Sequence, residues 1–84
     1  EGGRVTRLAS PQWRKAPPAQ AFGIMAEEDP ETASWCSKAN AWLIGCELQR
    51  LGINVNCAPV VDVLHEITHS IIGDRAFSYH PDIV

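Results

Sequence analysis

A chain of 84 residues with 45% hydrophobic residues can form one modest core, since a domain of this size buries only about 60% of its unfolded surface. Its formal net charge of -3, with seven lysines and arginines, provides no basic stripe for a phosphate backbone, which excludes nucleic acid as an expected partner. No apolar run approaches the ~20 residues that cross a bilayer, and residues 1–20 lack the pattern of a secretory signal. We therefore expect a cytoplasmic chain of at most one domain, without a membrane partner.

The three cysteines, Cys36, Cys46 and Cys57, are predicted to be reduced thiols in the core. Cys36 and Cys46 fall on one predicted helix, roughly 15 Å apart along its axis at ~1.5 Å per residue, which is too far for a disulfide. Disulfides are also rare in the cytoplasm. No disulfide framework and no cofactor are expected.

The first third of the chain predicts little regular structure. Residues 1–9 are glycine-rich and then apolar and basic, which is typical of a turn beside a strand end. Residues 10–28 contain Pro11, Pro17 and Pro18 and few periodic apolar positions, so we expect an irregular connection there.

A helix is predicted from Pro30 to Leu51. Asp29 supplies the N-cap, Pro30 suits the first helical position, and Gly52 supplies a left-handed stop. At 100° per residue, six side chains fall within one arc whose width suits burial against a sheet. They are Trp35, Cys36, Ala39, Trp42, Leu43 and Cys46.

A strand is predicted within residues 53–63, ending near Ala58 or Val63. The segment is rich in β-branched residues, and Pro59 interrupts it where a ladder hydrogen bond would be lost. Residues 64–80 predict a second irregular stretch, and residues 80–84 the first turn of another helix. This order predicts an α/β fold with parallel strands, whose neighbours must come from other βα units.

Arg7 and Arg75 are the leading candidates for a binding site. A guanidinium fork binds hydroxyls, carboxylates or phosphates with fixed geometry, and both arginines fall in turns that flank predicted strand ends. The alternative is that each is a surface arginine or pairs with a nearby carboxylate such as Glu1 or Asp74. Asp62 follows a predicted strand, where barrel folds place ligand-facing groups, but it can equally hold the following loop by accepting backbone N–H bonds.

The segment His65 to His69 matches the zinc metallopeptidase pattern. In that pattern two histidines at i and i+4, here His65 and His69, bind zinc, and the glutamate, here Glu66, acts as a general base. The chemistry needs a helix through the motif and a third ligand, whereas Gly73 and the strand-like run before the motif favour a solvated loop.

The three tryptophans raise the question of a sugar-stacking surface, since aromatic faces pack well on pyranose rings. Trp35 and Trp42 lie on the predicted helix arc and are expected in the core. Trp13, in the proline-rich segment, remains open. Gly2-Gly3 lacks the third glycine and the lysine of a phosphate-binding loop.

Taken in order, six segments resemble the bacterial β-N-acetylhexosaminidases of glycoside hydrolase family 3, over essentially the whole of residues 1–84. The family folds as a (β/α)8 TIM barrel, which typically needs ~250 residues. The resemblance implies that this chain supplies the end of the second strand, the second helix, the third strand and the start of the third helix. The segments are Glu1 to Leu8, Phe22-Gly23, Trp42 to Leu48, Leu51 to Ile53, Ala58 to Val63 and Ile72 to Phe77.

The resemblance implies a retaining hydrolase that removes terminal β-linked N-acetylglucosamine, typically from muropeptides in cytoplasmic cell-wall recycling. Arg7 and Arg75 match family arginines that bind the sugar, and Glu1, Asp62 and Asp74 are expected to support them. The family's aspartate nucleophile and its histidine acid/base lie outside these 84 residues, so the fragment is expected to be inactive alone. The loop 64–70 departs from the family pattern.

Two alternatives stay open. One is a small zinc peptidase centred on His65, Glu66 and His69. The other is a non-catalytic module that binds a saccharide or a protein through the two arginines. If the chain is a barrel fragment, the remainder of the barrel is needed for folding, because an isolated parallel strand leaves both edges unpaired. We then expect the isolated chain to be disordered or to aggregate.

Overall fold

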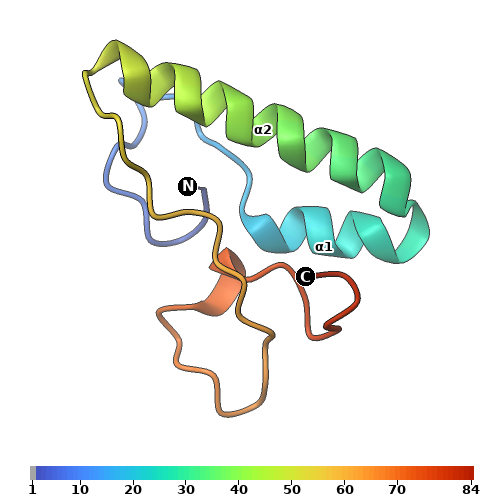
Figure 1. Ribbon diagram of the computed structural model, residues 1–84. Helices are drawn as coiled ribbons and strands as arrows, with labels where there is room; N and C mark the ends of the chain where they lie inside the picture. The colour runs from blue at the N-terminus through green and yellow to red at the C-terminus, as the bar shows by residue number, and fades with distance from the viewer. Residues whose placement is uncertain (1) are drawn as a thin grey trace.

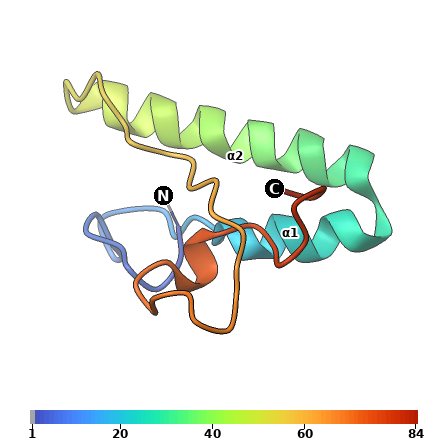
Figure 2. The same ribbon diagram turned by 60° about the horizontal axis from the view of Figure 1, so that its bottom comes forward.

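The computed structural model describes residues 2–84, and all of its regular structure is helical (Figure 1). Helix α1 spans Ala19–Glu28, helix α2 spans Pro30–Arg50, and the 3-10 helix η1 spans Gly73–Arg75. A single residue, Asp29, separates α1 from α2, so the two helices lie side by side and run in opposite directions. The remaining segments wind along one side of this helix pair (Figure 2).

Helix α1 corrects the expectation of an irregular connection over residues 10–28. The three prolines of that region all precede the helix, and Pro18 occupies its N-cap position. Six of the ten helical residues are alanine, glutamate or methionine, which favour helix strongly. Phe22 and Gly23 are buried, so tertiary packing fixes a helix whose apolar periodicity is weak.

Helix α2 confirms the predicted helix and both of its end signals. The Asp29 carboxylate accepts a hydrogen bond from the Thr32 backbone N–H at 3.0 Å, and Pro30 follows in the first turn. The hydrogen bonds from Thr32, from its hydroxyl first and then its backbone N–H, lower the pKa of Asp29.

The C-terminal end of α2 has the geometry of a Schellman motif. Gly52 takes a positive φ of 77°, and its N–H donates to the Gln49 carbonyl at 3.0 Å. The N–H of Ile53 reaches the Leu48 carbonyl at 3.1 Å. The helix therefore ends at Arg50, one residue before the predicted end.

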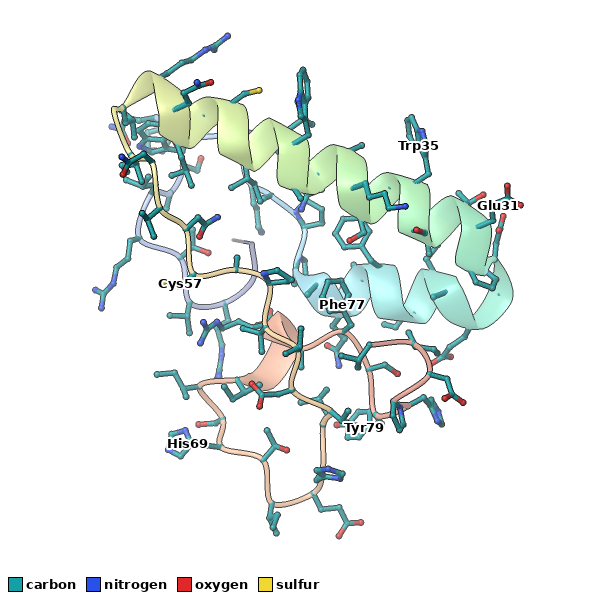
Figure 3. All side chains as sticks on the ribbon, viewed as in Figure 1. Glu31, Trp35, Cys57, His69, Phe77 and Tyr79 are labelled. Atoms are coloured by element: carbon teal, nitrogen blue, oxygen red, sulfur yellow. The ribbon has the colours of Figure 1, made fainter. Side chains whose placement is uncertain are left out.

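The arc of α2 that was expected against a sheet is largely uncovered. Trp35 and Trp42 are 71% and 70% exposed, and Trp35 points away from α1 (Figure 3). The buried position of α2 is Ala33, which lies outside that arc. The prediction was wrong because it assumed a sheet, and no strand forms among residues 2–84.

The predicted strand over residues 53–63 and the strand end within residues 1–9 are not found in the part of the chain that the structure describes. Residues 53–63 run as an irregular segment, in which Val55 and Val61 are 75% and 71% exposed. A strand is defined by hydrogen bonds to a neighbour, and parallel neighbours come from distant units. Of the α/β fold expected from the sequence, only helices are observed among the described residues.

The core is small and lies between the helix pair and the C-terminal segment. Its buried apolar residues are Phe22, Ala33, Leu64 and Ala76. The N–H of Leu64 donates to the carbonyl of the buried Ser78 at 3.0 Å and so closes the base of the loop between them. The helix start predicted at residues 80–84 is a single turn, closed by a hydrogen bond from the Ile83 N–H to the His80 carbonyl at 3.0 Å.

All three cysteines are free thiols, as the sequence predicted. Cys36 and Cys46 are partly buried, whereas Cys57 is exposed and does not belong to the core. Neither α1 nor α2, nor any other helix in the described residues, is long and apolar enough to span a membrane.

Candidate functional site: an arginine-lined cavity

The two arginine-bearing turns at opposite ends of the chain are joined by hydrogen bonds. The backbone N–H of Arg4 donates to Asp74 Oδ2 at 3.0 Å and to Oδ1 at 3.3 Å, across 70 residues of sequence. The Arg4 side chain also donates, through Nη2, to the carbonyl of Ser70. These contacts fix the N-terminal segment against the segment that carries η1.

Gly3 makes this close approach possible. Its φ of 101° is a conformation that side chains rarely adopt. A Cβ added there would also lie only 2.9 Å from Asp74 Oδ1. The Asp74 carboxylate therefore packs directly on the backbone of Gly3, where a side chain would stand in its way.

Arg7 and Arg75 line the same cavity, whose volume is about 360 Å³. Arg7 comes from the N-terminal segment and Arg75 from η1, while α2 forms a further wall. The other lining residues are Val5, Thr6, Leu8, Trp13, Arg14, Ala16, Ile44, Glu47, Leu48 and Asn56. Apolar walls with a few polar groups are typical of small-ligand sites.

Arg75 is held in place by its own turn. Its backbone N–H donates to the Ile72 carbonyl at 2.9 Å, and its Nη1 donates to the Ile71 carbonyl at 3.4 Å. It also borders a second cavity of about 350 Å³, which it shares with Lys38, Asn40 and Phe77 among others. Arg75 and Asn56 thus stand at the boundary between two cavities.

An ion pair connects the N-terminal segment to α2 at the rim of the first cavity. Arg14 Nε lies 3.1 Å from Glu47 Oε1, and Arg14 Nη2 donates to Oε2 at 3.4 Å. Both side chains are about one third exposed, at 36% and 31%, so solvent screens the pair. Its two-point geometry orients the loop more than it adds stability.

Among the described residues that line this cavity, Glu47 is the one carboxylate, and it is paired with Arg14. A retaining glycoside hydrolase commonly needs a free carboxylate as the nucleophile at the scissile bond. The cavity therefore has the groups to bind an oxygen-rich ligand, while its described lining residues do not include an unpaired carboxylate.

The three carboxylates expected to support the arginines have different surroundings. Asp74 contacts the Arg4 backbone, as described above. Asp62 is exposed and does not line the cavity. Glu1 lies outside the described residues.

The segment His65 to His69 forms a turn in place of the helix that the zinc pattern requires. The His65 N–H donates to the Thr68 hydroxyl at 2.7 Å, and the Thr68 N–H returns to the His65 carbonyl at 2.9 Å. His69 Nδ1 accepts a hydrogen bond from the Ile71 N–H at 3.2 Å, and in Figure 3 His69 lies on the outlying loop. No group of three metal-ligating side chains gathers among residues 2–84.

Sequence reasoning did not assign Asn56, Arg14 and Glu47 to a site. Asn56 sits in a run that was interpreted as strand core, and the ion pair joins residues 33 positions apart, which no local pattern reveals. Trp13 lines the cavity as well, and the sequence alone does not assign it a role. Its place in a proline-rich loop, where core packing is least expected, was the available signal.

Comparison with known proteins assigns the chain to a class, the glycosyl hydrolases. The chain matches the family described as "Glycosyl hydrolase family 3 N terminal domain" over residues 1–84. It therefore belongs to glycosyl hydrolase family 3, as the sequence motifs predicted.

Several bacterial relatives match over all 84 residues. One, named "Beta-hexosaminidase", is from Xanthomonas axonopodis pv. citri (strain 306) and is 40% identical. Another of the same name, from Xylella fastidiosa (strain M12), is 39% identical. The chain spans 24% of the length of each of these relatives. No solved structure matches the chain.

Proposed function

We propose that this chain forms part of the sugar-binding site of a hydrolase that removes terminal β-linked N-acetylglucosamine. The observation that carries the proposal is that Arg7 and Arg75 line one cavity. Family membership and the names of the relatives support a saccharide ligand. Two guanidinium groups at fixed positions can hold the hydroxyl and amide oxygens of such a sugar by hydrogen bonds.

The proposed whole protein is a (β/α)8 barrel to which this chain contributes the end of the second strand, the second helix, which is α2, the third strand and the start of the third helix. In this proposal the reaction is retaining: a carboxylate from outside these 84 residues attacks the anomeric carbon, and water later releases the sugar. The nucleophile and the acid/base are provided by other parts of the barrel. The described cavity then contributes binding and orientation.

We further propose that the substrate is a muropeptide or a related glycan and that the reaction takes place in the cytoplasm. Both points follow from the resemblance of the motifs to the cell-wall recycling enzymes. They depend on the hydrolase proposal and are tested after it.

The test is hydrolysis of 4-nitrophenyl N-acetyl-β-D-glucosaminide by the protein at its natural length. Arg7→Ala and Arg75→Ala should each lower kcat/KM by about 10- to 100-fold, because a hydrogen bond involving a charged group contributes ~1.5–3 kcal/mol. Arg50→Ala is the matched control, since Arg50 lies in the last turn of α2 and lines neither cavity described above. It should leave kcat/KM unchanged.

The outcomes separate the competing functions. Hydrolysis whose first product is the β-anomer supports a retaining hydrolase, and release of N-acetylglucosamine from a purified muropeptide supports the narrower substrate. Sugar binding without hydrolysis would identify a binding module. Hydrolysis that survives both arginine substitutions at full rate would refute the proposed site.

A further inference from the structure

We infer that Trp13 forms the aromatic wall of this sugar site and stacks on the apolar face of the bound pyranose. The inference rests on the proposed function and deepens it, because it assigns a residue that contributes to ligand choice. Trp13 is half-buried and lines the same cavity as Arg7 and Arg75.

The chemistry of a pyranose explains why such a wall is useful. A sugar ring with equatorial hydroxyls is polar around its edge and carries C–H groups on its flat faces. Guanidinium and amide groups suit the edge, and here Arg7, Arg75 and Asn56 are available. An indole offers a large, rigid apolar surface for the face.

Trp13 also has a fixed support. The next residue, Arg14, forms the two-point ion pair with Glu47 of α2, and both of these residues line the cavity. Ile44 and Leu48 of the same helix add apolar surface to the lining of the cavity. A platform that is oriented in advance loses little conformational freedom when a ligand binds.

The other two tryptophans of the chain provide a contrast. Trp35 and Trp42 are 71% and 70% exposed on α2, and neither lines the cavity. Substitution of either one removes one indole, as at Trp13, without touching the proposed site. They therefore serve as matched controls.

The experiment measures N-acetylglucosamine affinity by titration calorimetry on the protein at its natural length. Trp13→Ala should weaken binding about tenfold, in line with an aromatic contact worth ~1.5 kcal/mol. Trp13→Phe, which keeps an aromatic face and the local packing, should stay within about threefold of wild type. Trp42→Ala should bind as wild type does.

A spectroscopic measurement separates contact from support. In protein labelled with 5-fluorotryptophan, the ¹⁹F resonance that disappears in Trp13→Phe should shift when N-acetylglucosamine is added. The resonances assigned to Trp35 and Trp42 should not shift. The shift itself is measured on the wild-type protein, and the conservative variant Trp13→Phe is needed only to assign the resonance.

The results distinguish this inference from the proposed function. If wild-type protein binds the sugar, Arg7→Ala weakens binding, and the Trp13 resonance and the Trp13→Ala affinity stay unchanged, the aromatic wall is refuted and the arginine site stands. If wild-type protein neither binds nor hydrolyses the sugar, the proposed function fails, and the inference fails with it.

Discussion

Replacing Gly23 with alanine should destabilise the protein, whereas the same change at Gly45 should stabilise it. Both glycines lie in helix interiors, Gly23 in α1 and Gly45 in α2. A methyl group at Gly23 would overlap the backbone carbonyl of Phe77, while a methyl group at Gly45 would meet nothing within 4 Å. The pair therefore isolates the close approach of α1 to the C-terminal segment.

The magnitudes follow from two opposing effects. Alanine is favoured over glycine in a helix interior by about 1 kcal/mol, so Gly45→Ala should raise the free energy of unfolding by up to that amount. Gly23→Ala gains the same helix preference but overpacks the core, which costs about 1–3 kcal/mol. The group in the way is the Phe77 backbone carbonyl, which cannot rotate away, so we expect an overpacking cost of about 3 kcal/mol. The free energy of unfolding should then fall by about 2 kcal/mol in total.

Urea unfolding of wild type and both variants, each at natural length, measures this difference. The two variants should differ by about 3 kcal/mol in the free energy of unfolding, with similar m-values. Equal stabilities for Gly23→Ala and Gly45→Ala would show that α1 does not pack on Phe77. The explanation that tertiary packing stabilises helix α1 would then be wrong.

Two further predictions concern carboxylates. Because its pKa is lowered in the folded state, the capping contribution of Asp29 is complete above its unfolded-state pKa and is lost as pH falls through the folded-state value. The difference in urea midpoint between wild type and Asp29→Ala should therefore shrink in acid. Asp29→Asn, which keeps a cap without a charge, should remove this pH dependence. An unchanged difference in acid would contradict the capping role. Asp74→Ala removes both carboxylate oxygens that accept the hydrogen bond from the Arg4 N–H. This change should raise KM for the glucosaminide about tenfold, since such charged hydrogen bonds contribute ~1.5–3 kcal/mol. Asp62→Ala, at an exposed site outside the cavity, should leave KM unchanged, and the reverse result would reassign the supporting carboxylate.

The sequence predicted α2 well because its limits are local. An N-cap at Asp29 and a left-handed residue at Gly52 act within a few positions of the helix ends. Helix α1 was missed because three prolines in the same region outweighed its helix-favouring composition. The face of α2 that is buried was also mispredicted, since burial depends on which element lies opposite, and α1 was not expected.

The candidate site was predictable only in part. Arg7 and Arg75 were singled out by their residue type and by the family resemblance, but spacing alone could not bring them to one cavity. The contact that fixes their two segments, from the Arg4 N–H to Asp74, spans 70 residues and involves a backbone donor that every sequence contains. Such a contact leaves no sequence signal except Gly3, whose positive φ it requires.

The segment 53–63 shows what the proposed barrel would add to this chain. Val55 and Val61 are exposed, and so is Asn56, although Asn56 lines both cavities beside the helix pair. Ala58, Pro59 and Val60 are consecutive and all line the second cavity, so the segment does not show the period of two that a strand has. No ladder forms among the described residues, and the segment has no neighbour that would impose strand geometry on it. Parallel strands on either side would supply the backbone hydrogen-bond partners that the segment lacks, so completing the proposed barrel should order it as a strand beside the cavity that Asn56 lines.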